Sequence, residues 1–325
     1  MPACRMPASR SLLLQTALGA AVAAFMAHPA AAADLTIGIP GWPSAEATAH
    51  VLGEVIEEEL GLTVAYKKGD VDDLFAMVER GEVDIFPEIW LPNHRNYVRD
   101  LAEQKQVMSM ISRGVPARQG ICATRYTAET LGLRSVDDLM KPEVMAALDS
   151  NLDSRGEMWI GASDWSSTKI EKVRAKSYGY AETMQLLESD ERTAMAALDV
   201  AVAVERPFVF YCYEPHHMFI LHDIVILDEP GYDPTKWNIV EDDDPDWLEK
   251  SEAKSAWGLS FIHIGYANRL KTEHPKVVDL LEEVDLEADA ISEMTYALTV
   301  ERKEPKRFAR EWIMANDGRV RAWSH

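Results

Sequence analysis

The stretch LTIGIPGWPSAEATAHVLGEVIEEELG, residues 35–61, establishes the architecture of the chain. It opens with a short apolar run that is typical of a buried strand, and a Pro-Gly-Trp-Pro segment then breaks the run. A helix is expected from about Ser44, which can cap it, because apolar residues recur at helical spacing from there to Gly61. A buried strand that leads at once into an amphipathic helix is the first half of a βαβ unit.

The same alternation continues along the chain. Residues 62–67 alternate as a second strand, 72–80 have the pattern of a helix, and 83–86 are a third expected strand. This order predicts parallel βαβ units with helices on the faces of the sheet. A second such series follows, with strands expected at 120–123, 159–161, 207–213, 224–227 and 259–264, helices at 135–139, 166–176 and 192–204, a loop at 231–249, and helices again to the C-terminus.

Length and composition place the chain among globular proteins of two domains or lobes. It has 325 residues, of which 47% are hydrophobic and 27% charged, so global disorder is excluded. The formal net charge of −21 excludes nucleic-acid binding through the overall field, because phosphate groups require a basic surface.

The first 33 residues have the pattern of a cleavable signal peptide. Arg5 and Arg10 precede an apolar stretch over 11–27, and small residues then lead to Ala33, near which cleavage is expected. A membrane anchor is the alternative, but the apolar stretch is shorter than the roughly 20 residues that a spanning helix needs. Export leaves Cys122 and Cys212, which fit one disulfide or two buried thiols equally well.

Four aromatic residues each follow or end an expected strand. Ligands in open α/β sheets bind beyond the carboxyl ends of the strands, so these rings could face one another across a cleft. Several aromatic faces together suit a quaternary ammonium group, and each face contributes about 0.5–2 kcal/mol. The alternative is that each ring is an ordinary core or rim residue. We call this set the aromatic box: Trp42, Trp90, Trp165 and Tyr213.

Polar residues beside the aromatic box are secondary candidates. Glu88, Asp164 and Glu214 place carboxylates beside the aromatic box, where a cationic ligand would be favoured. Alternation along an extended segment would point Asp164 and Glu214 away from the rings, so they are expected at the rim or behind the contacting residues more than in direct contact. Ser166 opens a helix whose free amides could receive a ligand carboxylate, or it is a plain N-cap. His216 is either a polar ligand contact or a buried structural histidine.

Enzyme and metal motifs are missing from the sequence. There is no G-x-S-x-G, no P-loop, no G-x-G-x-x-G and no H-E-x-x-H. The acidic run at 241–244 lacks the spaced oxygen pattern of a calcium loop and is expected to be solvated surface. We therefore expect no catalytic residue, no metal site and no cofactor.

Four motifs in order resemble one known family. They are GWPSAE at 41–46, DIFPEIWLP at 84–92, YCYEPHHMF at 211–219, and FIHI at 261–264 followed by a similar stretch at 271–275. The chain resembles the substrate-binding proteins of ABC importers for glycine betaine, proline betaine and choline, over essentially all of its length after the signal.

The resemblance implies a two-lobe periplasmic binding protein of type II, in which each lobe is a central, mainly parallel sheet flanked by helices. Lobe 1 would comprise 34–113 and 258–325, and lobe 2 would comprise 114–257. The ligand would lie between the lobes, with two rings of the aromatic box from each. A ligand carboxylate would be held by backbone amides at Gly41 and Trp42 or by polar groups at Ser166 and His216.

Two departures from the family bear on the ligand. Tyr213 and His217 stand where tryptophan is common, and Glu88 and Glu214 bring negative charge close to the aromatic box. Glycine betaine or proline betaine is the expected ligand, while choline, carnitine, trimethylamine N-oxide or dimethylsulfoniopropionate would fit a modified box.

The expected protein is thus a monomeric, non-catalytic receptor in the periplasm. It would deliver a compatible solute to an inner-membrane permease with its ATPase. The alternatives are a periplasmic enzyme acting on a choline-like substrate, and a ligand-sensing receptor of the same fold.

Overall fold

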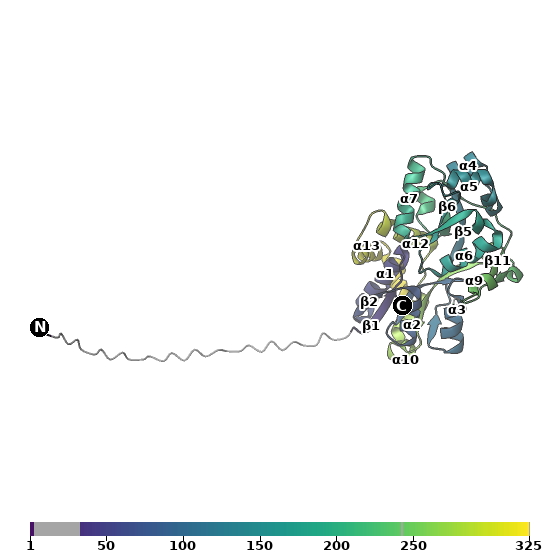
Figure 1. Cartoon of the computed structure of the whole chain (residues 1–325). Coiled ribbons are helices and arrows are strands. Elements are labelled where there is room, and N and C mark those ends of the chain that lie inside the picture. Colours follow the sequence, from purple (N-terminus) through teal and green to yellow (C-terminus); the bar gives the residue numbers. More distant parts are fainter. Residues whose placement is uncertain (3–32, 242, 325) are drawn as a thin grey trace. The chain divides into compact units, whose positions relative to one another are not determined.

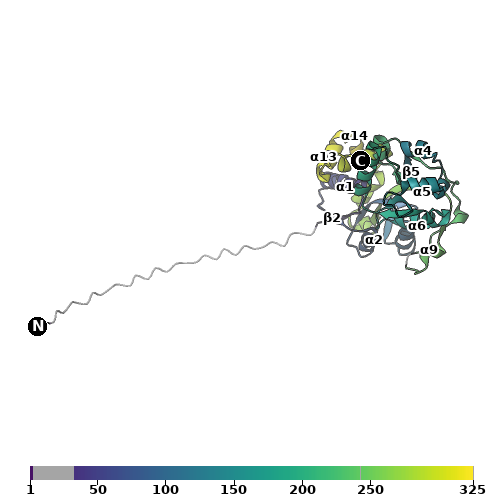
Figure 2. The same cartoon turned by 45° about the horizontal axis from the view of Figure 1, so that its top comes forward.

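The computed structural model describes residues 1–2, 33–241 and 243–324. The predicted signal peptide falls, apart from its ends, outside the described residues and stays a prediction. From residue 33 onward the chain forms a mixed α/β structure around a ten-stranded sheet (Figure 1, Figure 2). No helix of the described segments combines the length and the apolar character that crossing a membrane requires.

The N-terminal part of the sheet confirms the predicted βαβ units. β1 pairs in parallel with both β2 and β3, and its Ile37 and Ile39 are buried. α1 has Pro43 in its first turn, where a missing N–H costs little, and it ends at Gly61, whose φ is 67°. The elements are β1 (Leu35–Ile39), α1 (Pro43–Leu60), β2 (Val64–Lys68), α2 (Val71–Glu79) and β3 (Ile85–Leu91).

The middle of the chain builds the other part of the sheet. β6 pairs in parallel with β7 and β8, while β5 runs antiparallel to β8 and β9. β7 was not expected from the sequence pattern. The elements are β5 (Val115–Thr124), α4 (Arg125–Leu131), α5 (Pro142–Leu148), β6 (Gly156–Gly161), α6 (Ser166–Tyr178), β7 (Met184–Glu188), α7 (Glu191–Ala203), β8 (Val209–Glu214), α8 (Met218–Leu221) and β9 (Ile224–Ile226).

β12 (Ser260–Ala267) joins the two parts of the sheet. It lies antiparallel between β3 and β5 and also pairs with β4 (Met108–Met110), so the strand order is β2-β1-β3-β12-β5-β8-β6-β7. The sheet is therefore antiparallel at its centre and parallel on either side. The expected α/β class is confirmed with a mixed sheet: each part contains parallel strands, and the antiparallel pairs among the described strands of this sheet all involve β5 or β12.

The cysteines occupy neighbouring strands. β5 and β8 are antiparallel partners, which brings the Cα atoms of Cys122 and Cys212 to 5.7 Å in a disulfide. The sequence left open whether the two cysteines form a disulfide, and the pairing of β5 with β8 brings them together.

Helices of the C-terminal region pack against the first described helix of the chain. α12 and α13 pack against α1, as Figure 1 shows. The segment expected as a loop at 231–249 contains short elements instead. The remaining elements are α3 (Arg95–Val98), a π-helix (Arg99–Gln104), 3-10 helices (Val136–Met140, Tyr180–Glu182, Pro234–Lys236), β10 (Trp237–Asn238), α9 (Trp247–Lys250), β11 (Glu252–Ala253), α10 (Leu270–Glu273), α11 (Pro275–Glu283), α12 (Ala288–Thr299), α13 (Pro305–Ala315) and α14 (Asp317–Trp323).

Candidate ligand-binding site

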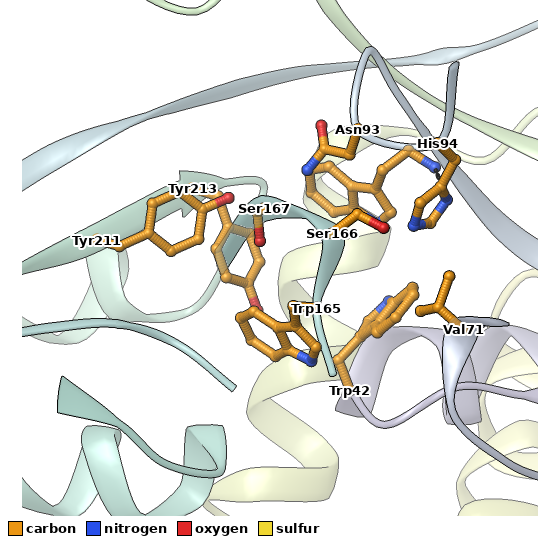
Figure 3. A pocket seen from close by; sticks show the side chains of 10 residues that line it. Trp42, Val71, Asn93, His94, Trp165, Ser166, Ser167, Tyr211 and Tyr213 are labelled. Atoms are coloured by element: carbon orange, nitrogen blue, oxygen red, sulfur yellow. Dashed lines mark hydrogen bonds between the residues drawn. The ribbon is translucent and has the colours of Figure 1, made fainter. Parts of the chain in front are cut away.

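The four residues of the aromatic box line one cavity (Figure 3). Trp42 lies directly before α1 and Trp165 directly before α6, while Trp90 is in β3 and Tyr213 in β8. Each side chain is less than a tenth exposed. The cavity holds about 360 Å³ of empty space, including its opening to solvent, and its lining comprises Trp42, Val71, Trp90, Asn93, His94, Trp165, Ser166, Ser167, Tyr211 and Tyr213.

The rings of the aromatic box meet edge to face. Ring centroids lie 6.3 Å apart for Trp42 and Trp165 and 5.4 Å apart for Trp90 and Tyr213, with interplanar angles of 84° and 85°. Trp165 and Tyr213 are 5.9 Å apart at 77°. This arrangement turns faces of different orientation toward one space, which suits a compact group of delocalised positive charge.

Glu88 accepts hydrogen bonds from two tryptophans of the aromatic box, Trp42 directly before α1 and Trp90 in β3. The indole Nε1 atoms of Trp42 and Trp90 donate to its Oε2 at 2.7 and 3.3 Å. The hydroxyls of Ser44 and Thr48 also donate to this carboxylate, at 2.9 and 3.2 Å. Burial raises the pKa of Glu88, and these four donors oppose that rise. Glu88 does not line the cavity, so it positions the rings from behind.

Glu191 positions Tyr213 through a hydrogen bond from behind the ring. This first residue of α7 is buried, and its Oε1 accepts the phenolic O–H of Tyr213 at 2.7 Å. The same oxygen contacts Nε2 of His216, while Nδ1 of His216 accepts the backbone N–H of Met218 at 3.0 Å. His216 is therefore a buried residue that orients Glu191 and does not line the cavity. No sequence signal pointed to Glu191.

His94 is a cavity residue that the sequence reasoning missed. Its Nδ1 accepts the backbone N–H of Trp90 at 3.1 Å, and burial lowers its pKa to about 3. The ring is thus neutral with its proton on Nε2, which makes that nitrogen a donor beside Trp42 (Figure 3). Its place four residues after Trp90, just beyond a strand end, was the signal that could have found it.

An amide pair connects the loop after β3 with β5. Asn93 and Gln119 exchange hydrogen bonds of 2.8 and 2.9 Å. Gln119 also accepts from the Tyr211 hydroxyl at 2.7 Å and donates to Ser260 at 2.9 Å. Gln119 therefore fixes Asn93 and Tyr211, both of which line the cavity.

The N-terminus of α6 completes the lining. Ser166 and Ser167 are its first residues, and both line the cavity. Among the described lining residues there is no Lys or Arg. Polar contacts available to a ligand are thus hydroxyls, amides, the neutral His94 ring and the indole N–H of Trp165, whose nitrogen is buried without a hydrogen-bond partner among the described residues.

Three further predicted residues lie outside this lining. Gly41 lines a neighbouring cavity, and a side chain there would meet Asp164. Asp164 itself is partly buried, which raises its pKa. Glu214 ends β8 and is partly buried. Within the described segments, no cluster of three or more His, Cys, Asp or Glu side chains could hold a metal ion.

The family described as the substrate binding domain of ABC-type glycine betaine transport systems matches residues 33–315. The chain belongs to this family. The match includes every residue of the aromatic box and the sheet from β1 to β12.

Several solved structures have a similar fold. A choline binding protein of an ABC transporter, in complex with choline, has a TM-score of 0.71 at 18% identity, covering 89% of this chain and 90% of that one. Lactococcal OpuAC in its closed form with glycine betaine has a TM-score of 0.67 at 19% identity, with 90% and 99% covered. A glycine betaine/L-proline-binding protein from Borrelia burgdorferi has 0.69 at 18%, with 89% and 96% covered. These likenesses show the fold, which is that of type II periplasmic binding proteins.

Proposed function

We propose that this protein is the periplasmic receptor of an ABC importer and that it captures a quaternary ammonium compound in the aromatic box. The observation that carries the proposal is the convergence of four buried aromatic rings, from four strand ends, on one cavity without a basic side chain. A trimethylammonium group cannot donate hydrogen bonds, so aromatic faces are its best partners.

Hydrogen-bond donors beside the aromatic box would hold the other end of the ligand. Nε2 of His94 and the hydroxyls of Ser166 and Ser167 border the same cavity. The first amides of α6 add the positive end of a helix dipole. A betaine carboxylate and a choline hydroxyl are both acceptable there, and the two similar structures with glycine betaine and with choline support both candidates equally.

The ligand would lie between two lobes, residues 34–113 with 258–325 and residues 114–257. Five of the lining residues come from each of these parts, which supports closure around a bound ligand. The closed form would then dock on a membrane permease with its ATPase, with the receptor acting as a monomer.

Calorimetric titration of the protein from residue 34 onward tests the proposal. Ligand carried through purification is first removed by unfolding and refolding. Choline and glycine betaine are compared with the alcohol in which a tert-butyl group replaces the trimethylammonium group. We expect micromolar binding of at least one ammonium compound and at least tenfold weaker binding of the neutral analogue, because only the charged group gains from the ring faces. Equal binding of the neutral analogue, or binding of neither ammonium compound, would overturn it.

A further inference from the structure

Two buried carboxylates flank the aromatic box. Glu88 is 1% exposed and holds Trp42 and Trp90, while Glu191 is 4% exposed and holds Tyr213. They reach the box from different elements, β3 and the start of α7. Burial raises the pKa of the Tyr213 phenol, and the negative charges of Glu191 and Glu88 raise it further, so both charges act on the same ring.

No basic side chain balances either carboxylate. In the described part of the chain, neither Glu88 nor Glu191 forms an ion pair with Lys or Arg. The four donors to Glu88 are two indoles and two hydroxyls, all of which are neutral. Glu191 has one carboxylate oxygen, Oε2, without a hydrogen-bond partner among these residues.

His216 does not supply the missing positive charge. Its Nδ1 accepts the backbone N–H of Met218, so that nitrogen carries no proton and the ring is neutral. Nε2 then holds the single ring proton and donates it to Glu191. The partner of Glu191 is thus a dipole, as the partners of Glu88 are.

We propose that Glu88 and Glu191 are specificity-determining residues that make the aromatic box select a ligand of net positive charge, such as choline, over zwitterionic betaines. The inference rests on the proposed function and reverses the ligand order expected from the family resemblance. A buried carboxylate without a counter-charge is unfavourable, and a cation enclosed by the rings supplies that charge. A betaine supplies it too but brings its own carboxylate into a cavity flanked by two negative groups.

The positive features of the cavity are weaker than this negative pair. The α6 N-terminus is equivalent to about half a charge, and the N–H groups of His94 and Trp165 are neutral dipoles. They suffice for a hydroxyl oxygen and offset only part of the repulsion on a carboxylate.

The test measures, by calorimetry, how tightly choline, tetramethylammonium and glycine betaine bind to the wild type and to the variants Glu88→Gln and Glu191→Gln. Glutamine keeps an acceptor for the indoles or the phenol and removes only the charge. Exposed Glu59→Gln removes a charge of the same sign far from the cavity and is the matched control. Titrations at about 0.1 M and 1 M salt separate the buried pair from the surface charge, because salt shortens the Debye length from about 10 to 3 Å and screens exposed charges.

We expect the wild type to bind choline at least tenfold more tightly than glycine betaine at both salt concentrations. Each Gln variant should bind choline and tetramethylammonium at least tenfold more weakly, because removing one charge within about 12 Å costs at least that factor at an effective dielectric of about 20. The affinity for glycine betaine should change less than about threefold, because the attraction of its ammonium group and the repulsion of its carboxylate partly cancel.

Three results would overturn the inference while leaving the proposed function intact. In the first, the wild type binds glycine betaine as tightly as choline. In the second, each Gln variant loses affinity for both ligands by the same factor. In the third, the preference of the wild type for choline disappears at high salt. Loss of all ammonium binding in the folded wild type would instead contradict the proposed function. Should Glu88→Gln fail to fold, the wild-type ratio and Glu191→Gln still decide.

Discussion

Replacing Trp165 removes one ring of the aromatic box and should weaken ligand binding in a graded way. Its ring contacts Trp42, Tyr213 and Trp159 at centroid distances of 6.3, 5.9 and 5.8 Å, so it is held on three sides and presents the remaining surface to the cavity. Loss of a cation–π face of up to about 2 kcal/mol predicts an affinity roughly thirtyfold lower in Trp165→Leu. Trp165→Phe keeps a smaller face and should lose about threefold.

Calorimetry is the assay, because removing a tryptophan also changes the intrinsic fluorescence. Trp247→Leu in α9 is the matched control, since this half-buried tryptophan does not line the cavity, and it should bind within about twofold of wild type. Urea denaturation should show Trp165→Leu less stable by about 2–3 kcal/mol but folded at 25 °C. An affinity loss below twofold in Trp165→Leu, or equal losses in the Leu and Phe variants, would refute the role of the ring face.

Three other predictions concern stability and pH. Replacing both Cys122 and Cys212 by alanine should lower the free energy of unfolding by about 4 kcal/mol, because the bond closes a loop of sequence separation 90; an unchanged urea midpoint would contradict this. Burial lowers the pKa of His94 to about 3, so below its ordinary pKa of about 6.5 the unfolded chain binds a proton that the folded chain does not. The free energy of unfolding should therefore be retained above pH 6.5 and should fall by up to about 1.4 kcal/mol per pH unit as pH falls toward 3. In His94→Asn this fall should be shallower. Identical slopes of unfolding free energy against pH in the two proteins would count against the buried neutral ring. Gln119→Leu removes the hydrogen bonds to Asn93 and to the Tyr211 hydroxyl, and it should lower the unfolding free energy by about 2–4 kcal/mol and ligand affinity at least threefold. Unchanged calorimetric and urea titrations would show that the amide pair is dispensable.

Much of the fold was predictable because its elements carry local signals. β1, α1 and β3 combine hydrophobic periodicity with a proline or glycine at their ends. β4 and β7 are short or half-polar strands, and β7 lies at an edge of the sheet. Such strands exist through pairing with a neighbour and leave little pattern in the sequence.

The candidate site also has a part that the sequence predicted and a part that it did not. The aromatic box was predictable, because its residues sit at expected strand ends, and the structure brings all four together around one cavity. The groups that orient these rings were not. Glu88 was expected to bring negative charge close to the box, and only the structure shows that it lies behind two indoles. Glu191 had no signal because its partner Tyr213 is distant in sequence.

The sequence by itself determined the α/β class, the family, the placement of aromatic rings at strand ends and the residue types available for an ammonium site. These depend on local periodicity, turn residues and short motifs, which are readable along the chain. Only the tertiary structure decided the disulfide, the antiparallel centre of the sheet, the neutral state of His94 and His216, and the uncompensated pair Glu88 and Glu191. Each of these depends on which side chains and strands meet after long stretches of chain, and on the burial that follows.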